Sequence, residues 1–483
     1  MEKRCQVYSL ATLCCLVVCN LLIATCDHLL SPHRLRLSLA LAVTVLMSLL
    51  ALASSVQPLS STSHLTEEGV DRFPLKAILE ALETQYPFPE HELRKWQSLR
   101  SNLIEEASTV RTRSAFANAV QQAFQSLGIS HLRLYDELYT NTDEIQARGR
   151  SHTGIRFQWI EDHWYVAGLQ QTSGRTGISL EPGDEVTHLN GRRLPSVQQG
   201  ASVQTLASTP LLNFGPNGDT WKIRARKPSG QSFEATGTYT TWYGRWSRSI
   251  GNLDSLPFEF DSRREGNIHI LRFTAFVYDL LPEIRKALLE LPDDVGLILD
   301  LRGNPGGMGL MANALAGLLT DHAFQLGTLN LKQGWIGFFA DPQPGAFLGP
   351  VAILIDAFSA STSEIFALGL QEAGRARLFG QPSMGAALPS KWLKLEGNWS
   401  LQLPVATYLS AEGHTIEGTG VRPDTTIVTT REDLRNKRDA TLEAAIHWIR
   451  SQLQSPQADN KVTPMPSVVP SMPIPQESFQ SEA

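Results

Sequence analysis

The chain has 483 residues, 42% of them hydrophobic, which is enough for roughly two to four domains with cores of their own. Its formal net charge is −6 and charged residues make up 19% of it, so the composition does not predict a nucleic-acid-binding protein. All five cysteines precede Asp27. The chain beyond that point therefore has no thiol nucleophile, no cysteine-ligated metal and no disulfide.

Two apolar runs occupy residues 8–26 and 37–52 near the N-terminus. The second run follows a basic stretch at 33–36 and ends at the small-residue triplet 51–53, which together form the three parts of a secretory signal. The first run is long enough to span a membrane, so either translation starts downstream of it or both runs form a membrane hairpin. We favour export with cleavage near residue 53, and both alternatives predict a periplasmic or other extracytoplasmic location.

The next region, residues 58–150, is predicted to be helical because its apolar residues recur at helical spacing. The Tyr-Pro-Phe-Pro stretch at 86–89 interrupts this pattern. Gly128 is expected to end the last helix as a C-cap, and a short strand is expected at 129–134. The three predicted helices cover 73–82, 90–107 and 113–127.

Residues 151–241 change to short strands and turns. The stretch GISLEPGDEVTHLNG at 177–191 resembles the signature of PDZ domains, in which glycines occupy turns that need positive φ. The resemblance implies a small β-rich PDZ-like domain whose backbone N–H groups hold a peptide carboxylate while the peptide adds as a strand. The alternative is a β-rich insertion without that role. The residues implied in peptide binding are Gly154, Ile155, Arg156 and Phe157.

Residues 255–453 have an α/β pattern, and its clearest stretch begins with the apolar run 351–355. A short, unbroken run of this kind is typical of a strand buried on both faces of a parallel sheet. Ser361 follows the run and precedes a predicted helix at 364–372. Its spacing from Glu364 fits a capping box, which puts Ser361 at a helix N-terminus. There it serves either as a helix cap or as a nucleophile whose oxyanion faces free N–H groups.

The remaining elements of this region surround a Gly-rich turn, residues 300–307, that follows a second buried strand. No GxxxxGK motif is present, so the turn is not predicted to bind phosphate. The tail at 454–483 is rich in Pro, Ser and Gln and is predicted to be disordered. We expect a linker at 251–261, strands at 267–273, 295–299 and 399–409, and helices at 277–291, 310–319 and 434–453.

Three motifs in this region resemble those of the S41 family of serine peptidases, which comprises the carboxyl-terminal processing and tricorn-type proteases. They are DLRGNPGG at 300–307, SASTSE at 359–364 and GHTIEGTGVRPD at 413–424. The resemblance implies a crotonase/ClpP-like core, a mixed sheet with helices, preceded by the helical region and the PDZ-like domain. It also implies Ser361 as the nucleophile, with the backbone N–H groups of Gly307 and Thr362 as the oxyanion hole.

The general base separates the branches of this family. The processing branch uses a lysine at the position that Ala386 occupies here, so a Ser–Lys dyad at that position is excluded. Without that lysine, Glu372 loses the supporting role that the branch implies, and Lys391 is a poor substitute on spacing. The spacing of His414 and Glu417 on a strand would direct the two side chains to opposite faces, which argues against His414 as the base.

The tricorn-type branch instead uses a histidine that follows a serine, together with a glutamate before the final motif. The matching residues are His131, Ser130 and Glu417. By that resemblance His131 takes the proton from Ser361, Glu417 supports the site, and Ser130 hydrogen-bonds between them. An imidazole with a near-neutral pKa suits this task. No metal-ligand spacing is present, and no metal or other cofactor is expected.

The sequence therefore predicts an exported serine endopeptidase that acts through an acyl-enzyme. Its expected partner is a peptide or protein substrate bound by its C-terminus, with membrane attachment through the N-terminus as an alternative to cleavage. A second hypothesis is a catalytically inactive relative that binds peptides or acts as a scaffold, motivated by the missing lysine. A third is a binding protein for a small hydrophobic ligand, because a fold does not fix function.

Overall fold

The computed structural model divides the chain into two compact units, residues 1–68 and 69–483, and every residue described below lies in the second. The predicted signal or membrane segments and the predicted tail lie outside the described residues. Among the residues that are described, no helix has the length and apolar character needed to cross a membrane. The described residues are 73–136, 151–169, 179–194, 218–241, 245–248, 257–292 and 294–454.

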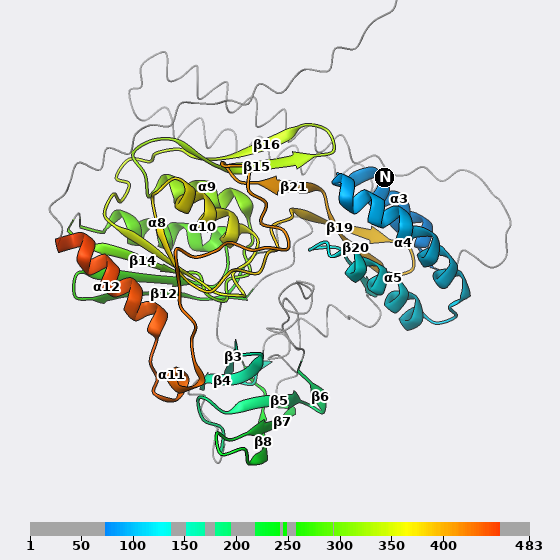
Figure 1. Cartoon of the computed structure of the whole chain (residues 1–483), viewed down its shortest axis with the longest axis horizontal. Coiled ribbons are helices and arrows are strands. Elements are labelled where there is room, and N and C mark those ends of the chain that lie inside the picture. Colours follow the sequence, from blue (N-terminus) through cyan, green and yellow to red (C-terminus); the bar gives the residue numbers. More distant parts are fainter. Residues whose placement is uncertain are drawn as a thin grey trace, which may run out of the picture. The chain divides into compact units, whose positions relative to one another are not determined.

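A six-stranded sheet forms the centre of the α/β region (Figure 1). Its strands pair in parallel except β12, which pairs antiparallel with β13. All five residues of β17 are buried, which confirms the strand predicted at 351–355 and its place inside a parallel sheet. In spatial order the strands are β12 (Phe260–Glu265), β13 (Ile268–Phe273), β14 (Gly296–Asp300), β17 (Val351–Ile355), β18 (Arg377–Gly380) and β22 (Thr425–Thr426).

Helices cover both faces of this sheet, because alternate residues of its strands enter two separate cores. On one face Leu271 and Ile353 pack with the predicted helices that flank the Gly-rich turn and Ser361. On the other face Ile270 and Leu354 pack with the last helix. The first face holds η3 (Tyr278–Leu280), α8 (Leu281–Leu289), α9 (Gly309–Gly317) and α10 (Thr362–Glu372), and the second holds α12 (Ala440–Gln454) (Figure 1).

Two predictions in this region are wrong in detail. The single helix predicted at 434–453 is two helices, α11 (Arg431–Arg435) and α12, because the chain turns at Lys437 with φ of 54°. The linker predicted at 251–261 contains strand residues from Pro257 onward, in β11 (Pro257–Phe258) and β12. These residues pair with β10 (Arg245–Trp246) and β13, so they belong to the fold and do not separate domains.

The predicted strand at 399–409 is also divided, since its two halves pair with different sheets. Strand β20 (Trp399–Pro404) pairs with β19 (Ser390–Leu395), whereas β21 (Ala406–Leu409) pairs with β15 (Phe324–Leu331). Strand β16 (Trp335–Ala340) completes the second of these sheets as a hairpin with β15 that the sequence analysis did not predict.

The helical region contributes α3 (Leu75–Gln85), α4 (Glu90–Thr109) and α5 (Arg113–Leu127), which confirms the three predicted helices. Gly128 caps α5 with φ of 75°, as predicted. The following strand, β1 (Arg133–Asp136), starts later than predicted because His131 adopts a positive φ of 58°. Strand β1 pairs with β20, so the turn that carries His131 is joined to the peptidase-like region.

The region at 151–241 consists of short strands, as predicted, although its identification as a PDZ-like domain remains a prediction. A sheet in the order β3-β4-β5-β7-β8, with β6 beside β5, encloses its own apolar core. The strands are β2 (Ser151–His152), β3 (Ile155–Ile160), β4 (His163–Leu169), β5 (Glu185–Leu189), β6 (Arg192–Arg193), β7 (Thr220–Arg226), β8 (Ser232–Thr238) and β9 (Thr240–Thr241).

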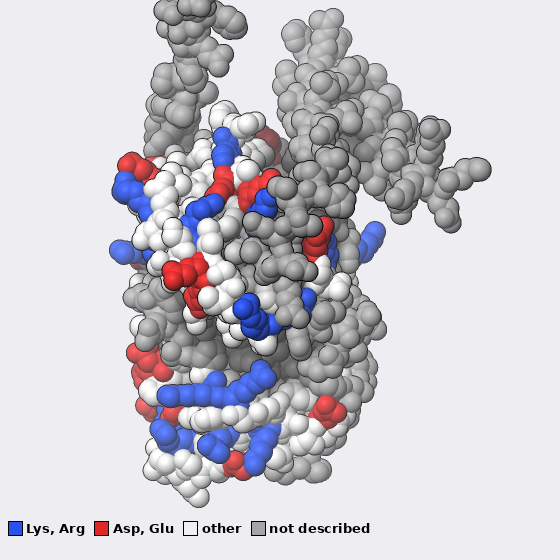
Figure 2. Space-filling model, turned by 90° about the vertical axis from the view of Figure 1, so that its right-hand side faces the viewer, with Lys and Arg blue, Asp and Glu red and all other residues white. Residues whose placement is uncertain are grey.

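The outward face of β7 carries basic side chains. Figure 2 shows Lys and Arg gathered in its lower part, where Figure 1 places β5 to β8. Lys222 and Arg224 both pair with Glu234, at 2.7 and 3.6 Å, and Arg226 pairs with Glu185 at 3.3 Å. These ion pairs satisfy much of the charge, so we interpret this face as ordinary solvated surface.

Candidate active site

Ser361 lies in the sharp turn between the carboxyl end of β17 and the first residue of α10. It is the N-cap of α10, as predicted, and its backbone has φ of 55° and ψ of −119°. A non-glycine residue rarely adopts positive φ, and such strain is typical of functional turns. The turn is fixed from below by Ser359, whose hydroxyl donates to Leu301 O at 2.8 Å. The side chain of Ser361 therefore projects beyond the sheet at the positive end of a helix.

The Gly-rich turn after β14 lies against the Ser361 turn. A Cβ atom on Gly306 would lie 2.6 Å from Ala360 O and 2.8 Å from Ser361 Cβ, so a larger residue does not fit. Gly307 has φ of 139°, and its carbonyl accepts the Thr362 hydroxyl at 2.9 Å. The absence of a side chain at Gly306 lets the two turns approach each other, and that at Gly307 lets the Gly-rich turn pack against the Phe276 backbone.

Two backbone N–H groups at this contact have no acceptor. Among the described residues, none accepts a hydrogen bond from the N–H of Gly307 or of Thr362. The Thr362 N–H is a first-turn donor of α10 with no acceptor in its own helix, and Gly307 is exposed, so both groups are available to an anion beside Ser361. These are the donors that the sequence analysis assigned to the oxyanion hole, and their geometry is compatible with that role.

Ser130, His131 and Glu417 are connected in one hydrogen-bonded chain. The Ser130 hydroxyl lies 2.9 Å from His131 Nδ1 and 2.9 Å from Glu417 Oε2, and the Ser130 N–H donates to Glu417 Oε1 at 2.6 Å. The contact expected through Ser130 is therefore present. No hydrogen bond joins Ser361 Oγ to His131 within the described structure, so the catalytic role of His131 stays a prediction.

Burial perturbs both ends of this chain. It lowers the pKa of His131 to about 4, which keeps the imidazole neutral at physiological pH. It raises the pKa of Glu417 to about 8, against the opposing effect of the Ser130 hydrogen bonds. Two perturbed groups that are joined through one hydroxyl are typical of functional sites.

The segment at 383–387 connects the Ser361 turn to Glu417. The Met384 N–H donates to Ser359 O at 3.0 Å, and the Ala387 N–H donates to Glu417 Oε2 at 3.3 Å. Ala386, which stands where the processing branch has lysine, is fully buried. This segment therefore supplies backbone donors, and the sequence analysis did not predict that role because backbone donors leave no residue-type signal.

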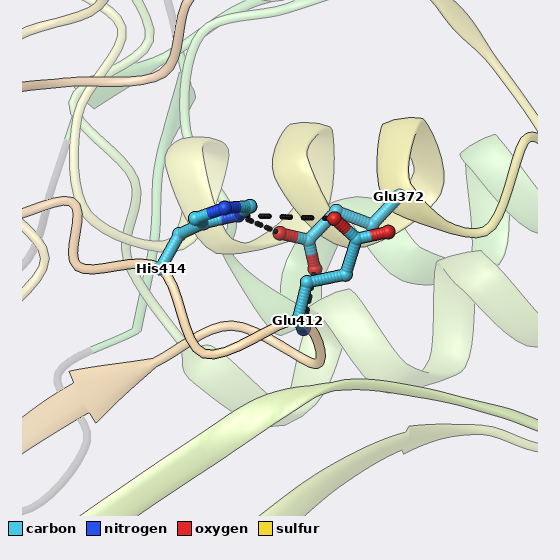
Figure 3. A group of neighbouring side chains, drawn as sticks. All are labelled: Glu372, Glu412 and His414. Atoms are coloured by element: carbon cyan, nitrogen blue, oxygen red, sulfur yellow. Dashed lines mark hydrogen bonds and ion pairs between the residues drawn. The ribbon is translucent and has the colours of Figure 1, made fainter.

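His414 belongs to a different group of side chains, shown in Figure 3. Its Nδ1 lies 2.9 Å from Glu372 Oε1, and that carboxylate raises its pKa. Within the described residues this group, with Glu412, is the only His/Asp/Glu cluster with metal-like spacing, its ligand atoms lying within 4.8 Å of one another. The Ser410 hydroxyl also donates to Glu372 at 2.6 Å. These bonds tie the end of α10 to the turn before Glu417 and direct His414 to Glu372.

The predicted peptide-binding loop uses two of its own donors internally. The Gly154 N–H donates to His152 Nδ1 at 2.7 Å, and the Ile155 N–H donates to Thr153 Oγ1 at 3.1 Å. Arg156 and Phe157 lie in β3, which pairs with β4. A peptide carboxylate would have to replace these internal bonds, so carboxylate binding here stays a prediction that the observed geometry does not favour.

Comparison with known proteins gives a consistent result for the core. The family model described as peptidase family S41 matches residues 265–427. The carboxy-terminal processing protease CtpA of Bacillus subtilis is 27% identical over 302 residues, which cover 60% of this chain and 60% of that protein. The carboxyl-terminal-processing protease of Synechocystis is 27% identical over 339 residues, covering 68% of this chain and 75% of that protein.

Solved structures extend the similarity to the fold. The photosystem II D1 C-terminal processing protease has a TM-score of 0.53 at 19% identity, covering 75% of this chain and 94% of that one. Mature CPAF has a TM-score of 0.56 at 15% identity, covering 78% and 96%. At this level of identity the likeness concerns the fold alone, and it confirms the predicted α/β fold of the core.

Proposed function

We propose that this chain, whose residues 265–427 match the model of peptidase family S41, is a serine endopeptidase of that family with Ser361 as its nucleophile. The observation that carries the proposal is a serine in a strained turn beside two backbone N–H groups, those of Gly307 and Thr362, that have no acceptor among the described residues. A mere helix cap would need neither the strain nor the second donor. An acyl-transfer site needs both an exposed hydroxyl and two N–H groups aimed at the developing oxyanion.

In the proposed mechanism, His131 accepts the proton of Ser361 as the hydroxyl attacks the peptide carbonyl. The carbonyl oxygen becomes an oxyanion that accepts from Gly307 and Thr362, and His131 then returns the proton to the leaving amine. Water hydrolyses the acyl-enzyme by the same steps in reverse order. The direct contact between Ser361 and His131 would form on substrate binding, since catalytic hydrogen bonds often tighten only in the complex.

Ser130 selects the tautomer of His131 in this proposal. When Glu417 is ionised, the Ser130 hydroxyl donates to it and accepts from His131 Nδ1–H, which leaves the Nε2 lone pair available as the base. When Glu417 is protonated, it can donate to Ser130, and the Ser130 hydroxyl then donates to Nδ1. The proton of the imidazole is then on Nε2, where it blocks general-base action.

The experiment that tests this function is hydrolysis of an unstructured protein such as casein by the full chain, with products identified by mass spectrometry. Ser361→Ala and His131→Ala should each abolish most hydrolysis, whereas His414→Ala, the rival histidine, should retain it. Hydrolysis that persists in Ser361→Ala would contradict the proposal. Folded wild-type protein that binds peptides without cleaving them would favour the second candidate, an inactive binding protein, which the absence of a lysine at Ala386 motivates.

We also propose that the enzyme is exported and acts on the C-terminal regions of its substrates. Export is supported by the signal-like residues 37–53 and by the lack of cysteine after residue 26. Substrate choice is supported only by the names of the relatives as carboxyl-terminal processing proteases. Two peptides that differ in a free or amidated C-terminus test it: equal cleavage of both would exclude recognition of the terminal carboxylate.

A further inference from the structure

Glu364 is a buried carboxylate that the proposed mechanism does not use. It is the third residue of α10, its side chain is almost completely enclosed, and it accepts four hydrogen bonds. Oxygen Oε2 accepts the N–H groups of Ser361 at 2.9 Å and Ala386 at 2.8 Å. Oxygen Oε1 accepts the Gly385 N–H at 2.7 Å and the Ser383 hydroxyl at 2.6 Å. One side chain thus holds the nucleophile turn and the segment at 383–387 together.

The hydrogen-bond partners indicate that Glu364 is ionised. Three of them are backbone N–H groups, which can only donate. The fourth, the Ser383 hydroxyl, already accepts the Val421 N–H at 2.6 Å and uses its own proton for Glu364. A proton on the Glu364 carboxyl would find donors and no acceptor among these four partners. Burial raises the pKa of Glu364, and the four hydrogen bonds therefore lower it against that effect.

Glu364 and Glu417 are joined through consecutive residues of one dipeptide. The Ala386 N–H donates to Glu364, and the next N–H along the chain, that of Ala387, donates to Glu417. Two buried carboxylates are therefore held close together with no basic side chain bonded to either within the described residues. Burial is the main cause that raises the pKa of Glu417, and the charge of Glu364 adds to it.

We infer that Glu364 is a positioning residue that fixes the Ser361 turn against the segment at 383–387, and that its negative charge opposes the ionisation of Glu417. The inference rests on the proposed function, because the ionised Glu417 gives His131 its active tautomer through Ser130. The other groups that face Glu417 are the Ser130 hydroxyl, the backbone donors and the Tyr86 phenol, whose own proton is bonded to Glu92 at 2.7 Å. Among the described groups near Glu417, Glu364 is the one that is both charged and hydrogen-bonded to the nucleophile turn.

The test is the pH dependence of kcat/KM for the full chain and its Glu364→Gln and Ser383→Ala variants. Removing the negative charge should move the rising limb to lower pH, because Glu417 then ionises without a neighbouring charge. The rate at high pH should fall more than tenfold, because the amide cannot accept all four donors. Ser383→Ala removes one donor but keeps the charge, so its limb should not move to lower pH.

A purely structural role predicts that both variants lose rate with unchanged limbs, and that result would overturn the inference. If Glu364→Gln does not fold, infrared difference spectroscopy of the wild type decides the matter. A protonated carboxyl band of the wild type at neutral pH should be lost in Glu417→Gln, and a spectrum unchanged by that substitution would contradict the protonated Glu417 on which the inference depends. Absence of hydrolysis in the folded wild type would instead contradict the proposed function itself.

Discussion

Replacing Ser130 by alanine tests the hydrogen-bonded chain behind His131. The change removes a hydroxyl that lies 2.9 Å from both His131 Nδ1 and Glu417 Oε2, but leaves the 2.6 Å bond from the backbone N–H to Glu417. Hydrogen bonds to a charged group contribute about 1.5–3 kcal/mol each. If the bond to His131 stabilises mainly the positively charged ring of the transition state, losing it corresponds to a fall in kcat of about 10- to 150-fold.

The assay is steady-state hydrolysis of a fluorogenic peptide, with kcat and KM determined separately. We expect kcat to fall and KM to change little, since Ser130 lies behind the imidazole and not on the substrate side. Ser126→Ala is a matched control, because Ser126 is an exposed serine of α5 whose hydroxyl donates to Gln122 O of its own helix. A Ser130→Ala variant that keeps kcat within twofold of the wild type would refute the proposed role of the hydrogen-bonded chain of Glu417, Ser130 and His131.

Three further predictions follow from the same geometry. Gly306→Ala should abolish hydrolysis and destabilise the fold by about 1–3 kcal/mol in thermal unfolding, because its Cβ would lie 2.6 Å from a backbone oxygen. The control is Gly266→Ala, which is also at positive φ but in open space and should remain active. The pKa of Glu417 in the folded protein is raised to about 8, so its contribution to stability is complete below its ordinary pKa and is lost as the pH rises towards 8. Glu417→Gln should therefore make the free energy of unfolding less dependent on pH over that range. An unchanged pH profile would argue against the raised pKa. Ala386→Lys should lower the melting temperature and fail to restore hydrolysis to His131→Ala, because the position is fully buried; rescue would show that the processing-branch dyad can form here.

The elements that could be predicted from the sequence are those that local chemistry alone determines. The strand at 351–355 is apolar throughout and the helix at 113–127 ends at a glycine, and both were placed within a residue of their observed bounds. Pairing partners are not encoded locally. The alternation at 399–409 continues across Val405, yet the strands on either side join different sheets, so one strand was predicted where two exist.

In the candidate site too, features with a local motif could be predicted and long-range contacts could not. The motifs around Ser361 and Gly307 have enough residue-specific signal to predict the turn and its donors, and the relay through Ser130 was expected from a resemblance. Glu364 was interpreted only as a helix cap, because a capping glutamate and a glutamate that also accepts three distant donors look alike in sequence. Backbone donors such as those of Ala387 have no sequence signature, so they became apparent only in the folded chain.

The central claim is that Ser361 is a nucleophile activated by His131, and active-site labelling tests it most directly. The full chain is treated with a fluorophosphonate probe, and the adduct is located and its rate of formation measured by mass spectrometry. We predict one adduct on Ser361, absent in Ser361→Ala and formed at least tenfold more slowly in His131→Ala. Folded wild-type protein that forms no adduct, or a His131→Ala variant that reacts at the wild-type rate, would contradict the account.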